Sequence, residues 1–310
     1  MPPANKLVRT QVGFAAQVAI GKWYVCGHIL NTDYYGLGYS ASTPTEFPID
    51  DVIEIASGGV STKDILTNIT TLCQTFLYRT SQNICRLSGF VEKTNATGGL
   101  ISQTGISRNL SNIVKLQDEQ ATSWCVWLDD SNNLYCINPD GSIRIYANIS
   151  SIDEPIKTFF YVAGKGCMVL TNTGTLWNVV ANNGTATISE INFPYGEIEH
   201  IYPTTLSNAF FVLTKDKELY ATGNNQNYLL GLPEIKTYSE FEKVGIYDVK
   251  KIYSQSQQTY MLLKDGSLWY VGVKIWGITE RTEEFTQLLE NLTFKDIAGC
   301  GGTLLVTIKE

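Results

Sequence analysis

The sequence predicts an all-β protein of the β-propeller class, and three observations lead to that prediction. One short pattern, an apolar strand followed by a tight turn and an aromatic strand, recurs along most of the 310 residues. Its period of roughly 40 to 60 residues is typical of propeller blades. The two ends of the chain resemble the two parts of one further copy, which is how a ring of blades can close.

The clearest copy of the pattern occupies residues 249–272 and reads VKKIYSQSQQTYMLLKDGSLWYVG. It begins with an apolar-x-x-apolar strand start, and a second apolar strand follows at residues 260–263. Asp265 and Gly266 then supply the positive φ angles of a tight hairpin turn before the aromatic strand. Each copy is therefore predicted to form an antiparallel hairpin with one more strand.

Four weaker copies precede this one. Their turns are predicted at Asp216-Lys217, at residues 172–174 and at residues 131–133, and the copy at residues 52–89 carries extra residues between its strands. With the C-terminal segment included, the predicted blades start near residues 52, 113, 156, 198, 249 and 294.

The ends of the chain are predicted to share one blade. Residues 294–310 stop where a hairpin should turn, and residues 21–27 (GKWYVCG) resemble the missing strand. Pairing them would remove two unpaired sheet edges, which are costly and prone to aggregation. Six blades are therefore preferred, in one domain over residues 21–310, after an N-terminal arm or extra strand at residues 1–20. Seven blades is the alternative if residues 7–20 form strands of their own or residues 90–111 hide a blade.

Several short motifs resemble those of the RCC1 (regulator of chromosome condensation) repeat family. The matching positions are Ile297-Ala298-Gly299, the LWYVG strand at residues 268–272, Gly223-Asn224-Asn225 leading to Leu230-Gly231, and Tyr35-Gly36-Leu37-Gly38 after Gly27. The resemblance covers nearly the whole chain from about Gly21 onward, and it implies an RCC1-like β-propeller. It says little about function, because one fold hosts many functions.

The sequence departs from the family pattern in two respects. RCC1-type repeats usually place His before the Thr that opens the second strand, whereas Gln258 precedes Thr259 and Gly302 precedes Thr303 in this chain. Family members most often have seven blades, one more than the preferred count.

Composition narrows the classes of partner and compartment. The net charge of −7 and scattered Lys and Arg argue against nucleic-acid binding. No window approaches the roughly 18 apolar residues of a membrane span. Seven cysteines without a CxxC pair favour buried free thiols in a reducing compartment. We therefore expect a cytoplasmic protein.

The sequence offers no catalytic or metal-binding motif. There are two histidines, His28 and His200, and neither lies in a recognisable motif. GCGG at residues 299–302 lacks the Lys-Ser/Thr of a phosphate loop, and the Asp-rich turns lack the spacing of a calcium loop. We expect no enzyme activity, no cofactor, no metal and no small-molecule substrate.

Four residues are candidates for partner contact. Trp276 falls outside the strand register, which favours an exposed anchor. Asn95, Thr97 and Ile101 lie in the Gly/Thr/Ser/Asn-rich segment 90–111, which interrupts the repeat. Long insertions on a rigid scaffold often bind partners.

The sequence leaves three functions open. The leading hypothesis is a non-catalytic scaffold that presents loops to a protein partner, as a subunit of a larger assembly. One alternative is a structural protein of a virion or phage tail, in which case the virion replaces the cytoplasm as its location. Another is a guanine-nucleotide exchange factor for a small GTPase, a role that some RCC1 relatives have.

Overall fold

The computed structural model describes residues 4–10, 13–27, 41–47, 49–118, 121, 124–182, 185–205, 208–255, 257–273, 281–300 and 303–309. These residues form strands and one 3₁₀ turn, η1 (Gln226–Tyr228), without any α-helix among them. Within this part of the chain, no helix has the length and apolar character that crossing a bilayer requires.

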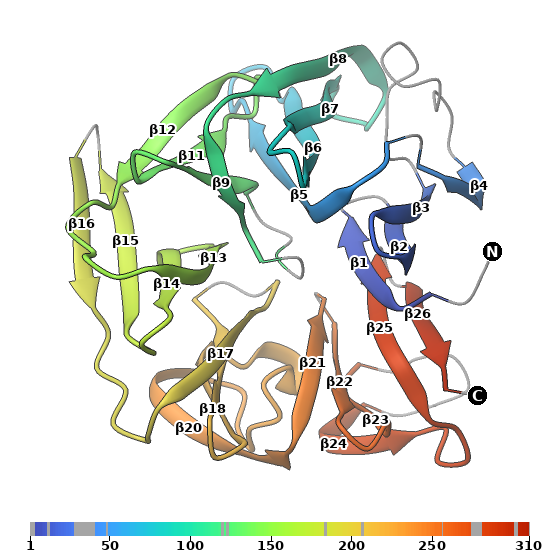
Figure 1. Ribbon diagram of the computed structural model, residues 1–310, viewed down its shortest axis with the longest axis vertical. Helices are drawn as coiled ribbons and strands as arrows, with labels where there is room; N and C mark the ends of the chain where they lie inside the picture. The colour runs from blue at the N-terminus through green and yellow to red at the C-terminus, as the bar shows by residue number, and fades with distance from the viewer. Residues whose placement is uncertain are drawn as a thin grey trace. The chain divides into compact units, whose positions relative to one another are not determined.

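The chain forms two compact units, and the first consists mainly of residues 1–152. It holds three four-stranded antiparallel sheets, drawn from blue to green in Figure 1. The first sheet contains β1 (Lys6–Thr10), β2 (Gly13–Ala19), β3 (Lys22–Gly27) and β4 (Ala41–Glu46). The second contains β5 (Val52–Lys63), β6 (Thr70–Thr80), β7 (Cys85–Thr94) and β8 (Leu100–Leu110). The third contains β9 (Ile113–Leu116), β10 (Val126–Asp129), β11 (Asn133–Ile137) and β12 (Ile143–Asn148).

The second unit consists mainly of residues 153–182, 187–298 and 304–310. Its first sheet contains β13 (Ile156–Val162), β14 (Gly166–Thr171), β15 (Leu176–Asn182) and β16 (Thr185–Glu190). The next contains β17 (Ile198–Pro203), β18 (Phe210–Thr214), β19 (Glu218–Asn224) and β20 (Thr237–Tyr247). The third contains β21 (Val249–Ser254), β22 (Gln258–Leu263), β23 (Leu268–Gly272) and β24 (Thr282–Leu288). A two-stranded sheet of β25 (Phe294–Cys300) and β26 (Thr303–Ile308) completes the set.

These seven sheets support the alternative count of seven blades, and the N-terminal residues explain the difference from six. Residues 6–19 form two strands of their own, whose side chains at Leu7, Val8, Ala15 and Ala16 are buried. Strand β3 pairs with β2 on one edge and with β4 on the other. The pairing expected between residues 21–27 and the C-terminal segment is therefore replaced by a complete N-terminal sheet, and residues 6–10 are a strand rather than an arm.

A single turn geometry recurs between the second and third strands of five sheets. In each turn the carbonyl oxygen of one residue accepts the N–H of the residue three positions later, and that later residue has a positive φ. The pairs are Thr80 with Asn83, Asp129 with Asn132, Thr171 with Gly174, Thr214 with Lys217, and Leu263 with Gly266. The predicted turns at 131–133, 172–174, 216–217 and 265–266 are thereby confirmed.

The sheet β5–β8 packs on both faces within the first unit. One face places Ala56, Leu77 and Leu87 in a buried cluster with Trp127 of the third sheet. The opposite face places Ile55, Phe76 and Tyr78 in a cluster with Trp23 of the first sheet. The Trp23 indole also donates a hydrogen bond of 2.9 Å to the carbonyl oxygen of Val52. Alternating side chains of one sheet thus fill two interfaces.

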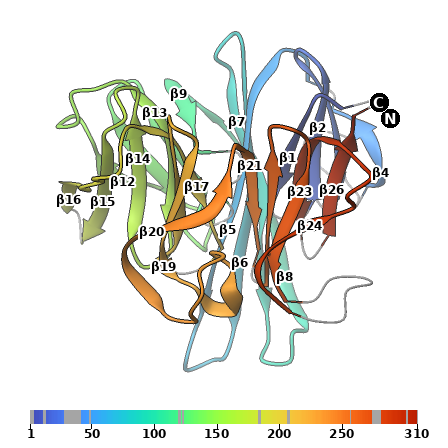
Figure 2. The same cartoon turned by 90° about the horizontal axis from the view of Figure 1, so that it is seen from below.

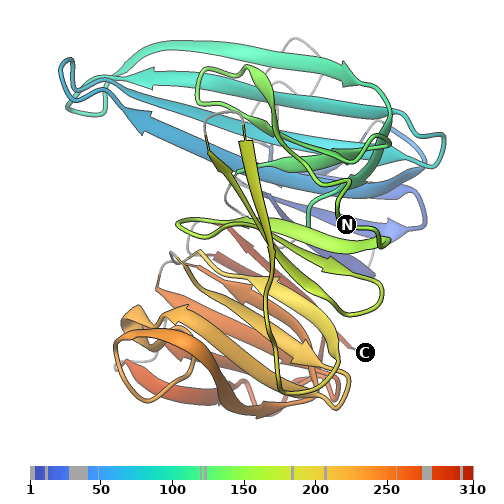
Figure 3. The ribbon, with the colours of Figure 1, turned by 90° about the vertical axis from the view of Figure 1, so that its left-hand side faces the viewer.

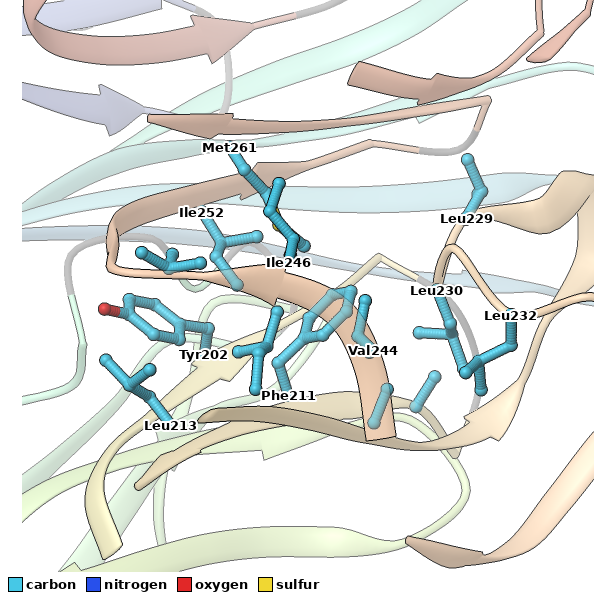
Figure 4. Close-up of a cluster of buried hydrophobic side chains, with 14 of the residues drawn as sticks. Tyr202, Phe211, Leu213, Leu229, Leu230, Leu232, Val244, Ile246, Ile252 and Met261 are labelled. Atoms are coloured by element: carbon cyan, nitrogen blue, oxygen red, sulfur yellow. The ribbon is translucent and has the colours of Figure 1, made fainter. Parts of the chain in front are cut away.

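A large buried cluster of the second unit joins the sheet β17–β20 to the sheet β21–β24. Figure 4 shows Phe211 and Val244 facing Ile252 and Met261 across this interface. The loop after η1 adds Leu229, Leu230 and Leu232, all buried.

The buried Asn225 side chain fixes this loop, because its amide donates 2.8 Å bonds to the carbonyl oxygens of Leu232 and Glu234 and its oxygen accepts the N–H of Leu230 at 2.9 Å. The Gly-Asn-Asn to Leu-Gly motif therefore has a structural role.

Candidate protein-interaction site

The strands of the sheet β5–β8 extend beyond the residues that are buried against neighbouring sheets. Its strands have 12, 11, 10 and 11 residues, whereas the other strands of the first unit have four to seven. Residues 61–63 of β5 and 100–104 of β8 are exposed. Figure 2 shows the β5–β6 and β7–β8 hairpins reaching past the sheet β1–β4. This distal half of the sheet projects beyond the core of its own unit.

The β5–β6 hairpin ends in an ordered turn that exposes two aliphatic side chains. The Asp64 carboxylate accepts the backbone N–H groups of Leu66 at 2.8 Å and Thr67 at 3.1 Å. These backbone hydrogen bonds lower the pKa of Asp64, so the carboxylate holds the turn at neutral pH. Ile65 and Leu66 are consequently presented to solvent, with 88% and 93% of their surface exposed.

The β7–β8 hairpin contains three of the four residues that the sequence suggests for partner contact. The Asn95 side-chain oxygen accepts three hydrogen bonds. The donors are the backbone N–H of Thr97 at 3.0 Å, the hydroxyl of Thr97 at 2.8 Å and the backbone N–H of Gly99 at 2.7 Å. Asn95 and Thr97 therefore build the turn. Ile101 has no Cα partner between the pairs Lys93–Ser102 and Thr94–Leu100, which makes it a β-bulge residue.

Both hairpin turns lie at the same end of the sheet. The strand register places Lys63, Thr70, Thr94 and Leu100 in one row across the four strands. Figure 3 shows these two turns at one end of the sheet. Ile65 and Leu66 come just after β5, and β5 and β8 are three strand spacings apart, or about 14 Å. Four aliphatic side chains thus share one end of the sheet, and we call them the distal patch: Ile65, Leu66, Leu100 (62% exposed) and Ile101 (52% exposed).

Sequence reasoning identified Ile101 but missed Ile65, Leu66 and Leu100. The signal available was an Ile-Leu pair inside the polar stretch KDILTNIT, which a turn would expose. Trp276, Tyr35–Gly38 and His28 lie outside the described residues. The contact roles of Asn95, Thr97, Ile101 and Trp276 stay predictions.

The titratable side chains of the described residues can be compared with the requirements of metal binding and nucleophilic chemistry. Among them, no three His, Cys, Asp or Glu side chains are grouped so that they could hold a metal. Burial raises the pKa of the Cys73 and Cys85 thiols to about 12, and it raises the pKa of Cys125 still further. Such thiols are protonated at neutral pH and are therefore poor nucleophiles. His200 packs edge-on against Tyr202.

No protein-family model matches this chain. No curated protein matches it either. The fold, however, has several counterparts among solved structures, and these carry the comparison.

Prp20p from Saccharomyces cerevisiae, described with its binding properties to Gsp1p and histones, superposes with a TM-score of 0.62 at 14% identity over 97% of this chain and 81% of its own. Yeast RCC1 (Prp20) with Kap60 bound gives a TM-score of 0.66 at 13% identity, over 97% of this chain and 79% of that one. Human WBSCR16 gives 0.66 at 14% identity, covering 100% and 87%. Identity this low shows the fold alone: the chain has the fold of an RCC1-like β-propeller.

Proposed function

We propose that this chain is a non-catalytic scaffold that binds a protein partner through the distal patch, as a subunit of a larger assembly. The observation that carries the proposal is the group of four exposed aliphatic side chains, two on the β5–β6 turn and two at the start of β8. A single exposed aliphatic residue is ordinary on a protein surface, but a cluster of them on a projecting element marks an interaction site.

The geometry of the patch favours recognition. Rigid turns lose little conformational entropy on binding, and the Asp64 and Asn95 side chains already hold both turns in place. Of the structural neighbours, Prp20p is described as binding Gsp1p and histones, and Kap60 is bound to yeast RCC1. Both descriptions concern the same yeast protein, which shares this fold and binds proteins, and this supports the same class of partner for this chain.

The test compares the wild-type protein with the double variant Ile65→Ser, Leu66→Ser and with a control, Ile20→Ser. Ile20 is 97% exposed in the first unit but lies outside the patch. Each protein is immobilised and exposed to native extract, and captured proteins are quantified by mass spectrometry. We expect a protein that the wild type and the Ile20→Ser control retain and the double variant loses. If the double variant captures the same proteins in the same amounts, the patch is not the contact site.

A stability measurement shows whether the double variant is still folded. Both substituted side chains are almost fully exposed, so the free energy of unfolding of the double variant should stay within about 0.5 kcal/mol of the wild-type value. Denaturant titration of the purified proteins provides that value.

A further inference from the structure

Strand β8 leaves one long edge of its sheet open. It is the last strand in the order β5-β6-β7-β8, and β7 pairs along its other edge from Cys85 to Thr94. In the described part of the chain, no strand pairs with the outer edge of β8. Its residues 100–104 are all exposed. An open edge presents unpaired N–H and C=O groups, which are suited to one kind of occupant, another extended strand.

The other outer strands of the four-stranded sheets carry the residues that usually block such pairing. Strand β4 contains a proline, and the remaining outer strands contain charged residues: Pro44 in β4, Arg144 in β12, Glu190 in β16, Glu240, Glu242 and Lys243 in β20, and Glu283 and Glu284 in β24. Charged side chains and proline discourage edge-to-edge pairing. The first eight residues of β8, Leu100 to Ser107, include no proline and no charged residue. Between the bulge at Ile101 and the charge of Arg108, residues 102–107 of this edge lack the usual protection.

We infer that β8 pairs antiparallel with β8 of a second copy of this chain, around a two-fold axis at Gly105. Two-fold symmetric pairing of one surface with itself is the commonest form of protein self-association. With Gly105 at the axis, Thr104 lies opposite Ile106 of the partner subunit, and Ser102 lies opposite Arg108 of the partner subunit, on the C-terminal side of the bulge at Ile101. Two four-stranded sheets then form one continuous sheet.

The charges of β8 are compatible with this register. Its single charged residue, Arg108, lies opposite Ser102 of the partner subunit, so no like charges face each other. Strand β20 is equally long, with 11 residues, and provides a contrast. Self-pairing about its central residue would place Glu242 opposite Glu242 of the partner subunit, which is destabilising. The sequence of β8 is thus compatible with self-pairing where that of β20 is not.

This inference goes beyond the proposed function, because it concerns backbone pairing along the edge of β8, a strand that also carries Leu100 and Ile101 of the distal patch. The Ile65→Ser, Leu66→Ser variant changes the β5–β6 turn and leaves every residue of β8 unchanged. It should therefore dimerise normally even if it loses the partner protein.

The experiment places a charge beside the two-fold axis. In the dimer, the two Thr104 Cα atoms would be about 8 Å apart, given a strand spacing of roughly 4.8 Å and a rise of roughly 3.4 Å per residue. Thr104→Lys would bring two ammonium groups together and Thr104→Glu two carboxylates. Thr104 is exposed, so neither substitution should disturb the monomer.

Light scattering coupled to size-exclusion chromatography measures the mass. We expect the wild type to show twice the 34.4 kDa of one chain, each Thr104 variant to show the single-chain mass, and an equimolar mixture of both variants to recover the doubled mass. If the mixture of the two Thr104 variants recovers the doubled mass, misfolding cannot explain why each variant alone has the single-chain mass. The control Thr187→Lys, on the outer strand β16, should keep the doubled mass.

Three results would overturn the inference. They are a wild type that stays at the single-chain mass across a dilution series, Thr104 variants that retain the doubled mass, and a mixture that stays at the single-chain mass.

Discussion

At the residue scale, the left-handed turn position is the most regular feature of this chain. Five hairpins place Asn83, Asn132, Gly174, Lys217 and Gly266 at positive φ, between +60° and +94°. Glycine adopts this conformation without steric cost, and asparagine tolerates it. The exception is Lys217, whose ammonium forms an ion pair with Glu199. Its turn was predicted from its place in the repeat.

Replacing Gly266 by Ala should destabilise the protein. The φ of Gly266 is +91°, and an added Cβ would lie 3.1 Å from the Phe294 carbonyl oxygen. A residue with a Cβ pays roughly 1–2 kcal/mol in the left-handed conformation, so the free energy of unfolding should fall by at least about 1 kcal/mol. Urea titration measures it. Gly245→Ala is the matched control, since nothing lies within 4 Å of its added Cβ; an equal loss there would contradict the turn argument.

The sequence predicted the turns better than it predicted the candidate site. Turns depend on a few local residue types, so a Gly or Asn between apolar strands identifies them. The Ile-Leu pair in a polar stretch indicates an exposed turn at Ile65 and Leu66, but it does not encode how far β5 and β6 extend past neighbouring sheets. Likewise, Asn95 was chosen for its place in an insertion, and only the structure shows its side chain bonded within the turn.

At the element scale, strands begin at the residues where the repeat begins. Their first residues are Val52, Ile113, Ile156, Ile198, Val249 and Phe294. The apolar-x-x-apolar start is strong enough to locate each first strand. The N-terminal hairpin was harder to predict, because β2 reads GFAAQVA and three of its seven residues are alanines. Alanine is depleted in strands, so residue propensities did not indicate a strand at residues 13–19.

A buried ion pair joins β21 to β25 within the second unit. The Lys251 ammonium lies 3.1 Å and 3.2 Å from the two carboxylate oxygens of Asp296, and both side chains are about nine-tenths buried. Removing one partner would leave the other charge without its counterion in the core. Asp296→Asn should therefore lower the free energy of unfolding by roughly 3–5 kcal/mol.

A double-mutant cycle checks the cause of that loss. Lys251→Met removes the cation, and the combined variant removes both charges. We expect the double variant to be more stable than the sum of the two single losses predicts, by at least about 1 kcal/mol. Additive losses would mean that the two side chains stabilise the fold independently.

At the scale of the whole molecule, the repeat was enough to predict an RCC1-like propeller. The blade count required the structure, since a complete N-terminal sheet replaces the blade that the two ends were expected to share. Repeats predict fold well because every copy must satisfy the same packing.

Removing residues 294–310 should make the second unit aggregate or unfold. Phe294 and Ile297 are buried against Tyr253, Leu262 and Tyr270. Each fully buried aliphatic side chain contributes roughly 1.5–3 kcal/mol, so losing several rivals the stability of a domain. Solubility and a thermal melt of the truncated chain measure the effect. Ile308→Ser, at a side chain 55% exposed, should melt like the wild type. A truncated chain that did so too would show that β25 and β26 are dispensable.

The projecting half of the sheet β5–β8 has a consequence for its local stability. One end of each strand lies in a core that can open only when the unit unfolds, while the other end is held by ladder hydrogen bonds in contact with water. Amide protons along a single strand should therefore exchange with solvent at two very different rates. The change between them should come near Val60 and Cys73, which face each other in the register and are the outermost buried residues of β5 and β6 at this end.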